Sequence, residues 1–468
     1  QLTLHPMLSR IPMRKKLREE LALAVTERRH GRSRTGGRDN EEKRRMKARR
    51  FTVMALLVLT VWAGKIWGTT PFDPRLRWQT LETPNFSVHY HEGEEGLAQE
   101  VGRIAEDVHR EISPYMRWKP FAKTQVVLSD NVDFANGMAT PFPVNTIVLF
   151  AAPPAGAELG VCEDWLRELI THEYTHILHL DQVGGIWQIL RYVFGRCVLP
   201  NAIQPIWLIE GFGVHNESKY TAGGRDRGAT FDMMLRVATL EGRLNSLDQA
   251  GTFIPSWPAG STPYLYGGMF YKWLAEEYGE EKLVEVSRLY SALIPFLVDL
   301  PAVVVYGKPW YVLWGEWVNH LREKYEKERK EIESKPLTSS TPLTCRGYYI
   351  ESPSFSPDGQ RIAYVEYNGD EYPSLRLSEL DQPAVGCERG GLENHIPVVR
   401  SLWLRKTEDP VLLRGPINPG VSFSPRGDGL ALSQRETYDN FYTYDDLYLL
   451  ALKTRKKTRL TRGLRARD

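Results

Sequence analysis

The sequence predicts an α+β chain in which a mixed α/β part and a mainly helical part are followed by an all-β part. Three observations support this prediction. Residues 86–150 alternate between strand-like and helix-like spacing, residues 165–332 contain several runs of helical spacing, and residues 343–468 contain short strand-like runs around a repeated turn motif. The 468 residues exceed one ordinary core, so two or three domains are expected.

The mixed part holds three predicted strands and one predicted helix. Residues 86–90, 124–128 and 145–150 have the composition and spacing of strands. Residues 95–116 carry apolar side chains at helical spacing. Asn136 and Gly137 form a dipeptide that is typical of turns, so we expect a turn there.

The helical part is predicted from five runs, at residues 165–180, 210–220, 269–278, 281–293 and 310–332. The last run ends in many charged side chains, which is typical of a solvated helix face. Residues 335–342 are polar and contain two prolines, so we place a domain boundary there.

The last part contains an internal repeat. Phe-Ser-Pro-Asp-Gly at residues 355–359 and Phe-Ser-Pro-Arg-Gly at residues 423–427 each precede a strand-like run at the same offset. Proline and glycine favour a turn at these positions, and each phenylalanine is expected to pack between sheets. Residues 343–468 therefore predict about two four-stranded blades of an incomplete β-propeller, with an inserted loop around residues 381–399. A propeller closes with ~4–8 blades, so we expect the native product to continue with more.

Residues 1–63 have the layout of a basic leader and signal peptide. Residues 1–50 hold 16 Lys/Arg and 6 Asp/Glu, and residues 51–63 form an uncharged, mostly apolar run that ends in Ala63. We expect export to the periplasm or cell envelope of a bacterium, with a mature N-terminus near Gly64; an uncleaved membrane anchor is the alternative. The remaining chain holds 44 Lys/Arg and 52 Asp/Glu, which gives no indication of a nucleic-acid partner.

The four cysteines do not predict a thiolate metal site. Cys162, Cys197, Cys345 and Cys387 contain no Cys-x-x-Cys pair. In an exported chain, a disulfide between Cys162 and Cys197 is possible, and two buried thiols fit the sequence equally well.

The motif that predicts chemistry is His-Glu-Tyr-Thr-His at residues 172–176. His172 and His176 are spaced i and i+4, so both imidazoles project from one face of a helix and can bind one metal ion. Glu173 lies beside them, where it can take a proton from a water on the metal. The sequence therefore predicts a zinc site with Glu173 as the catalytic carboxylate.

A catalytic zinc needs a third protein ligand and an open position. The metzincin pattern is excluded because positions 179 and 182 are His179 and Gln182 instead of Gly and His. Glu210, at the expected start of a second helix, is the candidate; the alternative is a carboxylate that is only stabilised by the helix dipole. Glu217 lies seven residues further on and is expected to accept a hydrogen bond from a ligand imidazole.

These residues resemble the gluzincin zinc peptidases. The motif at 172–176, Trp-Leu-Ile-Glu-Gly at 207–211 and the later Glu217 are similar to the aminopeptidase N and leukotriene A4 hydrolase branch, and to bacterial peptidase MA-like exported proteins. The resemblance implies a thermolysin/aminopeptidase-like domain over residues 64–335, with zinc on His172, His176 and Glu210. The chain lacks a Gly-x-Met-Glu-Asn exopeptidase segment, so endopeptidase activity is expected. The repeated turns resemble TolB-type propeller blades.

The resemblance also implies an oxyanion-stabilising tyrosine and a substrate-pairing strand. The segment from Tyr264 to Gly267 is similar to Tyr-x-x-Gly of the aminopeptidase branch, which makes Tyr264 the candidate and Tyr266 the second choice; simple packing of the aromatic ring is the alternative. The strand at 146–150 precedes the motif helix, as does the substrate-pairing edge strand of gluzincins. His179 and His215 are expected to be ordinary buried or flanking histidines.

The leading hypothesis is therefore an exported zinc endopeptidase that acts on a peptide or protein and uses its propeller to bind substrate or an envelope partner. The alternative is a non-catalytic envelope binding or scaffold protein. Glu173 favours the enzyme, because a structural metal site has no use for that carboxylate. A serine peptidase is not indicated, since no Gly-x-Ser-x-Gly segment occurs.

Overall fold

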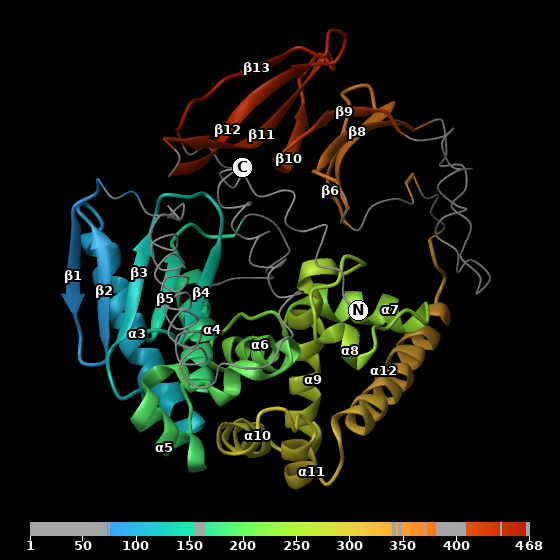
Figure 1. Ribbon diagram of the computed structural model, residues 1–468. Helices are drawn as coiled ribbons and strands as arrows, with labels where there is room; N and C mark the ends of the chain where they lie inside the picture. Colours follow the sequence, from blue (N-terminus) through green and yellow to red (C-terminus); the bar gives the residue numbers. More distant parts are fainter. Residues whose placement is uncertain are drawn as a thin grey trace, which may run out of the picture. The chain divides into compact units, whose positions relative to one another are not determined.

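The computed structural model describes residues 73, 75–154, 164–338, 343–344, 349–368, 371–380, 409–439 and 442–464. Over these residues the chain is of mixed α+β type, with ten α-helices and three β-sheets (Figure 1). The predicted leader and the predicted inserted loop at 381–399 lie outside the described residues. Within the described part, no helix combines the length and apolar character that crossing a membrane requires.

The first sheet has five strands in the order β1-β2-β3-β5-β4. Its strands are β1 (Trp78–Glu82), β2 (Phe86–His91), β3 (Thr124–Ser129), β4 (Asn136–Thr140) and β5 (Thr146–Phe150). Strands β2, β3 and β5 run parallel, and β4 pairs antiparallel with β5 at the edge. The three predicted strands are confirmed. The predicted turn at Asn136 and Gly137 is wrong, because these residues begin the edge strand β4.

Helix α3 (Glu95–Met116) covers this sheet over the predicted range. Its apolar stripe is buried against β2 and against the helix that follows the sheet, which explains why the helical spacing was a reliable signal. The helix ends at Met116, and the following Arg117 adopts the left-handed conformation.

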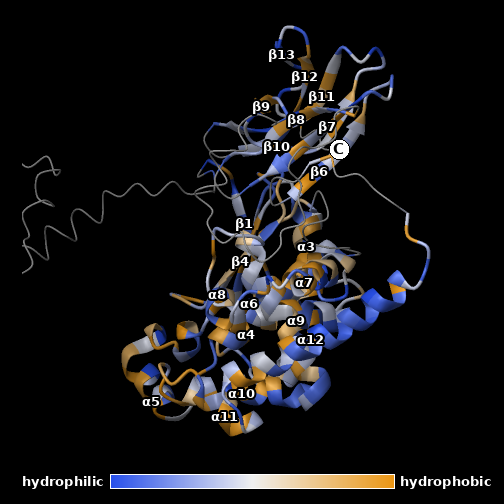
Figure 2. Cartoon of the chain, turned by 90° about the vertical axis from the view of Figure 1, so that its right-hand side faces the viewer, coloured by the Kyte–Doolittle hydropathy of each residue, from blue (hydrophilic) through white to orange (hydrophobic). Residues whose placement is uncertain are grey.

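The second part is helical, as predicted. The helices are α4 (Trp165–Leu180), α5 (Gly185–Phe194), α6 (Ile206–Tyr220), α7 (Ala229–Leu240), α8 (Leu247–Ala250), α9 (Thr262–Tyr278), α10 (Glu280–Ala292), α11 (Leu300–Tyr306) and α12 (Trp310–Glu333). Helices α6 and α9 begin several residues earlier than predicted, whereas α5, α7, α8 and α11 were not predicted. The C-terminal half of α12 is hydrophilic (Figure 2), which confirms the solvated charged face.

Helices α6 and α9 cross with their backbones almost in contact. A Cβ atom on Gly211 would lie 2.5 Å from the carbonyl carbon of Gly267, and one on Gly267 would lie 2.4 Å from the carbonyl oxygen of Trp207. Any larger residue at either glycine would therefore push the helices apart. Trp207 is buried beside this crossing, with its ring 5.4 Å from Phe270 and 5.1 Å from Trp310. The crossing fixes the two helices that carry Glu210 and Tyr264.

The last part forms two four-stranded antiparallel sheets. The first contains β6 (Tyr349–Phe355), β7 (Arg361–Tyr367), β8 (Ser374–Glu379) and β9 (Val411–Arg414). The second contains β10 (Ile417–Phe423), β11 (Gly429–Tyr438), β12 (Tyr442–Ala451) and β13 (Lys457–Arg459). In each sheet the strands follow chain order, and the repeated motif forms the turn between the first two strands. The described residues form no closed sheet and no closed propeller.

The two repeated phenylalanines differ in packing. Phe423 packs against the apolar cluster of these sheets, and the guanidinium of Arg361 in the first sheet lies 5.7 Å from its ring centroid. Phe355 is 63% exposed, so the prediction that it packs between sheets is wrong. Phe423, in the second of these two sheets, contacts the first. Phe355 lies in the first sheet, and among the described residues no other C-terminal sheet precedes it.

Candidate metal centre

Helix α4 supplies three of the predicted site residues. Its start is capped by Asp164, whose side chain accepts a hydrogen bond from the backbone N–H of Arg167. The helix is buried over most of its length, including Leu169, Ile170, Ile177 and Leu178. Because both helix faces are packed, the imidazoles of the motif are held in one orientation toward α6.

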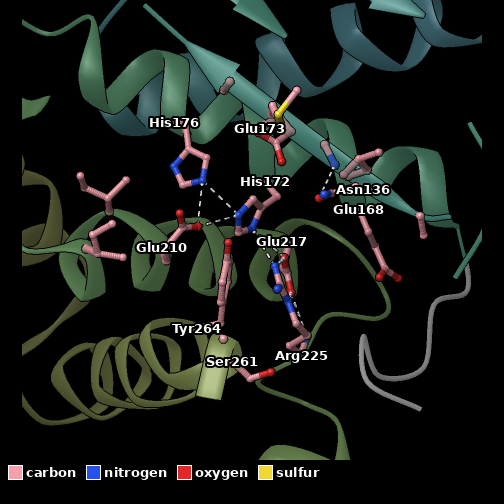
Figure 3. A pocket seen from close by; sticks show the side chains of 18 of the residues that line it. Asn136, Glu168, His172, Glu173, His176, Glu210, Glu217, Arg225, Ser261 and Tyr264 are labelled. Atoms are coloured by element: carbon pink, nitrogen blue, oxygen red, sulfur yellow. Dashed lines mark hydrogen bonds and ion pairs between the residues drawn. The ribbon is translucent and has the colours of Figure 1, made fainter. Parts of the chain in front are cut away.

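Helix α6 brings Glu210 to the two histidines. Oε2 of Glu210 lies 3.3 Å from Nε2 of His172 and 3.2 Å from Nε2 of His176, and the two Nε2 atoms are 3.0 Å apart (Figure 3). Helix α6 begins at Ile206, so Glu210 lies in its second turn and not at the helix start as predicted. Close approach of α6 depends on Gly213, where a Cβ atom would lie 2.5 Å from Cε1 of His172.

The donor set fits a tetrahedral zinc ion. Two imidazole nitrogens and one carboxylate oxygen are typical ligands of catalytic zinc, which binds them at ~2.0–2.2 Å. Tetrahedral geometry at that radius places the ligand atoms roughly 3.3–3.5 Å from one another. The observed separations of 3.0, 3.2 and 3.3 Å are close to this value. In the described part of the chain, His172, His176 and Glu210 form the group that can hold a metal.

Glu217 orients His172, as predicted, and Arg225 orients Glu217. Nδ1 of His172 lies 2.9 Å from Oε2 of Glu217. The guanidinium of Arg225 donates to both carboxylate oxygens, with Nη2 2.7 Å from Oε2 and Nε 2.8 Å from Oε1. Burial alone would raise the pKa of Glu217, but Arg225 and the hydrogen bond from His172 lower it to about 2. Glu217 is therefore a fixed anion beneath the imidazole.

The carboxylates of Glu210 and Glu217 also change the pKa of His172. Burial lowers the pKa of His172, but hydrogen bonds to Glu210 and Glu217 outweigh it and raise the value to about 9. The pKa of Glu210 is well below its usual range: burial raises it, and the two histidines lower it more strongly. The centre thus attracts positive charge, whether protons or a metal ion.

Glu173 lies on the other side of the motif, under the edge strand β4. Burial raises the pKa of its carboxyl group, although His172 and His176 act in the opposite direction. A Cβ atom on Gly137 would lie 2.6 Å from Oε1 of Glu173 and 2.7 Å from Cδ1 of Leu169. Gly137 therefore serves close approach of strand and helix, which explains why the predicted turn was wrong.

Tyr264 points into the centre and Tyr266 does not. In Figure 3 the side chain of Tyr264 extends from α9 toward Glu210 and His172; its ring centroid is 6.2 Å from that of His172 and 4.9 Å from Cζ of Arg225. Burial raises the pKa of Tyr264, and Glu210 raises it further, so the hydroxyl stays protonated. The hydroxyl of Tyr266 instead donates to Oδ1 of Asn245 within the core, 3.2 Å away.

The remaining histidines are outside the candidate ligand set. The ring nitrogens of His179 lie 2.7 Å from Oγ of Ser287 and 3.0 Å from Oε1 of Gln204, and burial lowers the pKa of His179 to about 3. Nε2 of His215 lies 3.1 Å from Oε2 of Glu280. Both are buried residues with partners, as predicted.

A cavity of about 650 Å³ opens onto the centre. Residues 135–139, which include most of β4, form one wall, and the motif helix, α6 and Tyr264 form the others. The prediction that the strand at 146–150 is the substrate-pairing edge is wrong, because β5 lies between β3 and β4. The edge strand that lines the cavity is β4. The sequence did not indicate this strand, because its first residues, Asn136 and Gly137, are typical of a turn.

Two other sequence expectations can be compared with the structure. Cys197 is exposed and free, so it is not the buried thiol of the alternative; Cys162, Cys345 and Cys387 lie outside the described residues. Arg225 was missed, because it follows α6 in a segment without periodicity. The only sequence signal for it was a basic residue shortly after two predicted carboxylates.

No protein-family model matches the chain. An uncharacterized protein of Treponema pallidum (strain Nichols) is 27% identical over 243 residues, which cover 52% of this chain and 21% of that protein. The match thus spans about a fifth of the relative's length. Among solved structures, TolB from Acinetobacter baumannii is similar at 22% identity and a TM-score of 0.17, over 27% of this chain and 22% of TolB.

Proposed function

We propose that the chain is an exported zinc-dependent peptidase, with His172, His176 and Glu210 as zinc ligands. The observation that carries the proposal is the cluster of three ligand atoms 3.0–3.3 Å apart, with Glu173 beside it in a cavity. The basic stretch and apolar run of residues 1–63 favour export. When bound, zinc supplies Lewis-acid chemistry, because it acidifies a water molecule and polarises a carbonyl group.

The chain's own residues supply the proton chemistry. Burial keeps the pKa of Glu173 above its usual value, which suits a carboxylate that takes a proton from water and later gives it to a leaving amine. The hydroxyl of Tyr264 remains protonated and can donate to the oxyanion of a tetrahedral intermediate. Glu217 and Arg225 hold the imidazole of His172 in place during the reaction.

The substrate is proposed to be an extended peptide. Strand β4 is the last strand at its side of the sheet, and residues 135–139 line the cavity. An extended chain can pair with the backbone of such an edge strand and thereby pass over the site. Since main-chain groups form this pairing, it favours peptides over other carbonyl substrates. The two C-terminal sheets are proposed to bind substrate or an envelope partner.

The experiment combines metal analysis with a peptidase assay on an unfolded protein substrate. We expect one zinc per chain and cleavage that a chelator abolishes and zinc restores. Glu173→Gln should retain zinc and lose cleavage, because the amide cannot accept the proton. Zinc binding without cleavage in the wild-type chain would instead favour a non-catalytic envelope binding protein.

A further inference from the structure

Helix α5 exposes most of its apolar side chains, while Trp187, Leu190 and Arg191 are its less exposed residues. The guanidinium of Arg191 donates to Oδ1 of Asp181, 3.0 Å away, and the indole N–H of Trp187 donates to the carbonyl oxygen of Leu293, 2.7 Å away. None of the ten residues of α5 is buried. A helix on a water-exposed surface normally presents mainly polar side chains to the solvent.

The outward face of α5 is aliphatic and aromatic. Tyr192 is 93% exposed, and four other apolar residues of the helix are exposed as well. They are Ile186, Ile189, Val193 and Phe194.

A second apolar segment lies beside α5. It runs from the end of α10 through α11, and Phe296 is 77% exposed. Its other exposed apolar residues are Ile294, Leu297, Leu300, Val303 and Val304. The backbone N–H of Gly184, just before α5, donates to the carbonyl oxygen of Ser291 near the end of α10, 2.9 Å away. Figures 1 and 2 both show α5, α10 and α11 gathered together.

We call these eleven exposed residues of α5 and of residues 294–304 the apolar ridge. Single exposed apolar residues are normal on a monomer, but so many large ones on two neighbouring segments are unusual. Arg191 and Arg196 beside the ridge are both paired with Asp181, so neither guanidinium is an unpaired cation there. Binding to this surface is therefore expected to come mainly from apolar burial.

We propose that the apolar ridge inserts into the interface of a lipid bilayer, with α5 lying in the membrane plane. Ten helical residues extend roughly 15 Å, which is too short to cross a bilayer but suits an interfacial helix. Tyrosine is favoured at this depth, and Tyr192 is the most exposed apolar residue of α5.

In the alternative in which the apolar run at residues 51–63 is an uncleaved anchor, that run holds the chain at a bilayer. It ends ten residues before Asp73, the first described residue. A fully extended stretch of that length reaches about 35 Å at most. If the run is retained as an anchor, Asp73 lies within that distance of the membrane. The bilayer is then close enough for the ridge to contact it. The proposal does not depend on the zinc site.

Vesicle flotation tests the proposal. The chain from Pro71 to Asp468 forms one compact unit and lacks the apolar run, so its binding is not due to that run. We expect it to float with vesicles of phosphatidylethanolamine and phosphatidylglycerol and with vesicles of phosphatidylcholine alone, at low and at high salt. Tyr192→Ser/Val193→Ser should reduce the partition coefficient about tenfold or more, because two apolar side chains lose their burial. Phe121→Ser, a change at an equally exposed aromatic residue outside the ridge, should have no effect.

Three results would overturn the proposal. The first is a double variant that floats like the wild-type chain. The second is binding that needs the anionic lipid and disappears at high salt. The third is a wild-type dimer in analytical ultracentrifugation that the double variant converts to monomers, without any binding to vesicles; the ridge would then be covered by a second copy. Circular dichroism checks that the variant is folded, and Phe296→Ser in the second segment provides an independent change with the same expected loss.

Discussion

Replacing Arg225 by methionine should uncouple Glu217 from the metal centre. Glu217 is buried, and its pKa of about 2 lies about 2.5 pH units below the ordinary value of 4.5 because Arg225 and His172 outweigh burial. At 1.4 kcal/mol per pH unit, this gap corresponds to about 3 kcal/mol. Loss of one partner of a buried ion pair typically costs ~3–5 kcal/mol, so Arg225→Met should lower the free energy of unfolding of the metal-free chain by about 3 kcal/mol at pH 7.

The assay is urea unfolding followed by zinc competition against a chelating dye. Zinc affinity should fall roughly 10–100-fold in Arg225→Met, because Glu217 no longer holds the imidazole of His172. Adding Glu217→Gln to Arg225→Met removes the unpaired charge and keeps an acceptor for Nδ1, so stability should largely return. If Arg225→Met unfolds within about 0.5 kcal/mol of the wild type, the carboxylate is not the fixed anion inferred from the contacts.

Three further predictions concern separate parts of the site and its support. Tyr264→Phe should lower kcat by roughly 10²–10³-fold with little change in KM, whereas Tyr266→Phe should leave kcat unchanged. A wild-type kcat in Tyr264→Phe would show that the hydroxyl of Tyr264 does not take part in the reaction. Gly137→Ala should reduce kcat/KM at least about tenfold without loss of zinc, because the new Cβ atom would collide with Glu173. The control Gly96→Ala should leave kcat/KM unchanged, because a Cβ atom there meets nothing within 4 Å. Burial lowers the pKa of His179 to about 3 in the folded chain, whereas the ordinary value of 6.5 applies in the unfolded chain. Between these two pH values only the unfolded chain binds the proton. The free energy of unfolding should therefore fall by up to about 1.4 kcal/mol per pH unit as the pH drops from 6.5 toward 3. Urea unfolding at several pH values should show a flatter dependence for His179→Gln, and an unchanged slope would count against the buried neutral imidazole.

The clustering of the candidate ligands was predictable because it depends on local geometry. Two histidines at i and i+4 share a helix face whatever the rest of the fold, and helical spacing was enough to place Glu217 on the same face as Glu210. Arg225 was not predictable in this way. Its contacts with Glu217 arise from the path of a loop after α6, and a loop residue carries no periodic signal.

Two errors had the same physical origin. The sequence predicts a turn at Gly137, but a glycine also occurs where a strand must approach a side chain closely. Only the position of Glu173 beside the strand distinguishes a turn glycine from a close-approach glycine here. Sequence spacing gives the side chains that share a face but not the partner of that face. Phe355 illustrates this limit, because its packing depends on whether another sheet precedes its own.

Zinc content and activity of Glu173→Gln, measured beside His172→Ala/His176→Ala, test the central claim most directly. We predict one zinc per chain and no peptide hydrolysis for Glu173→Gln, since the ligand atoms of His172, His176 and Glu210 are unchanged and only the proton acceptor is lost. The double histidine variant should contain no zinc. Stoichiometric zinc in that variant, or wild-type hydrolysis by Glu173→Gln, would contradict the assignment of this site as the metal centre of a peptidase.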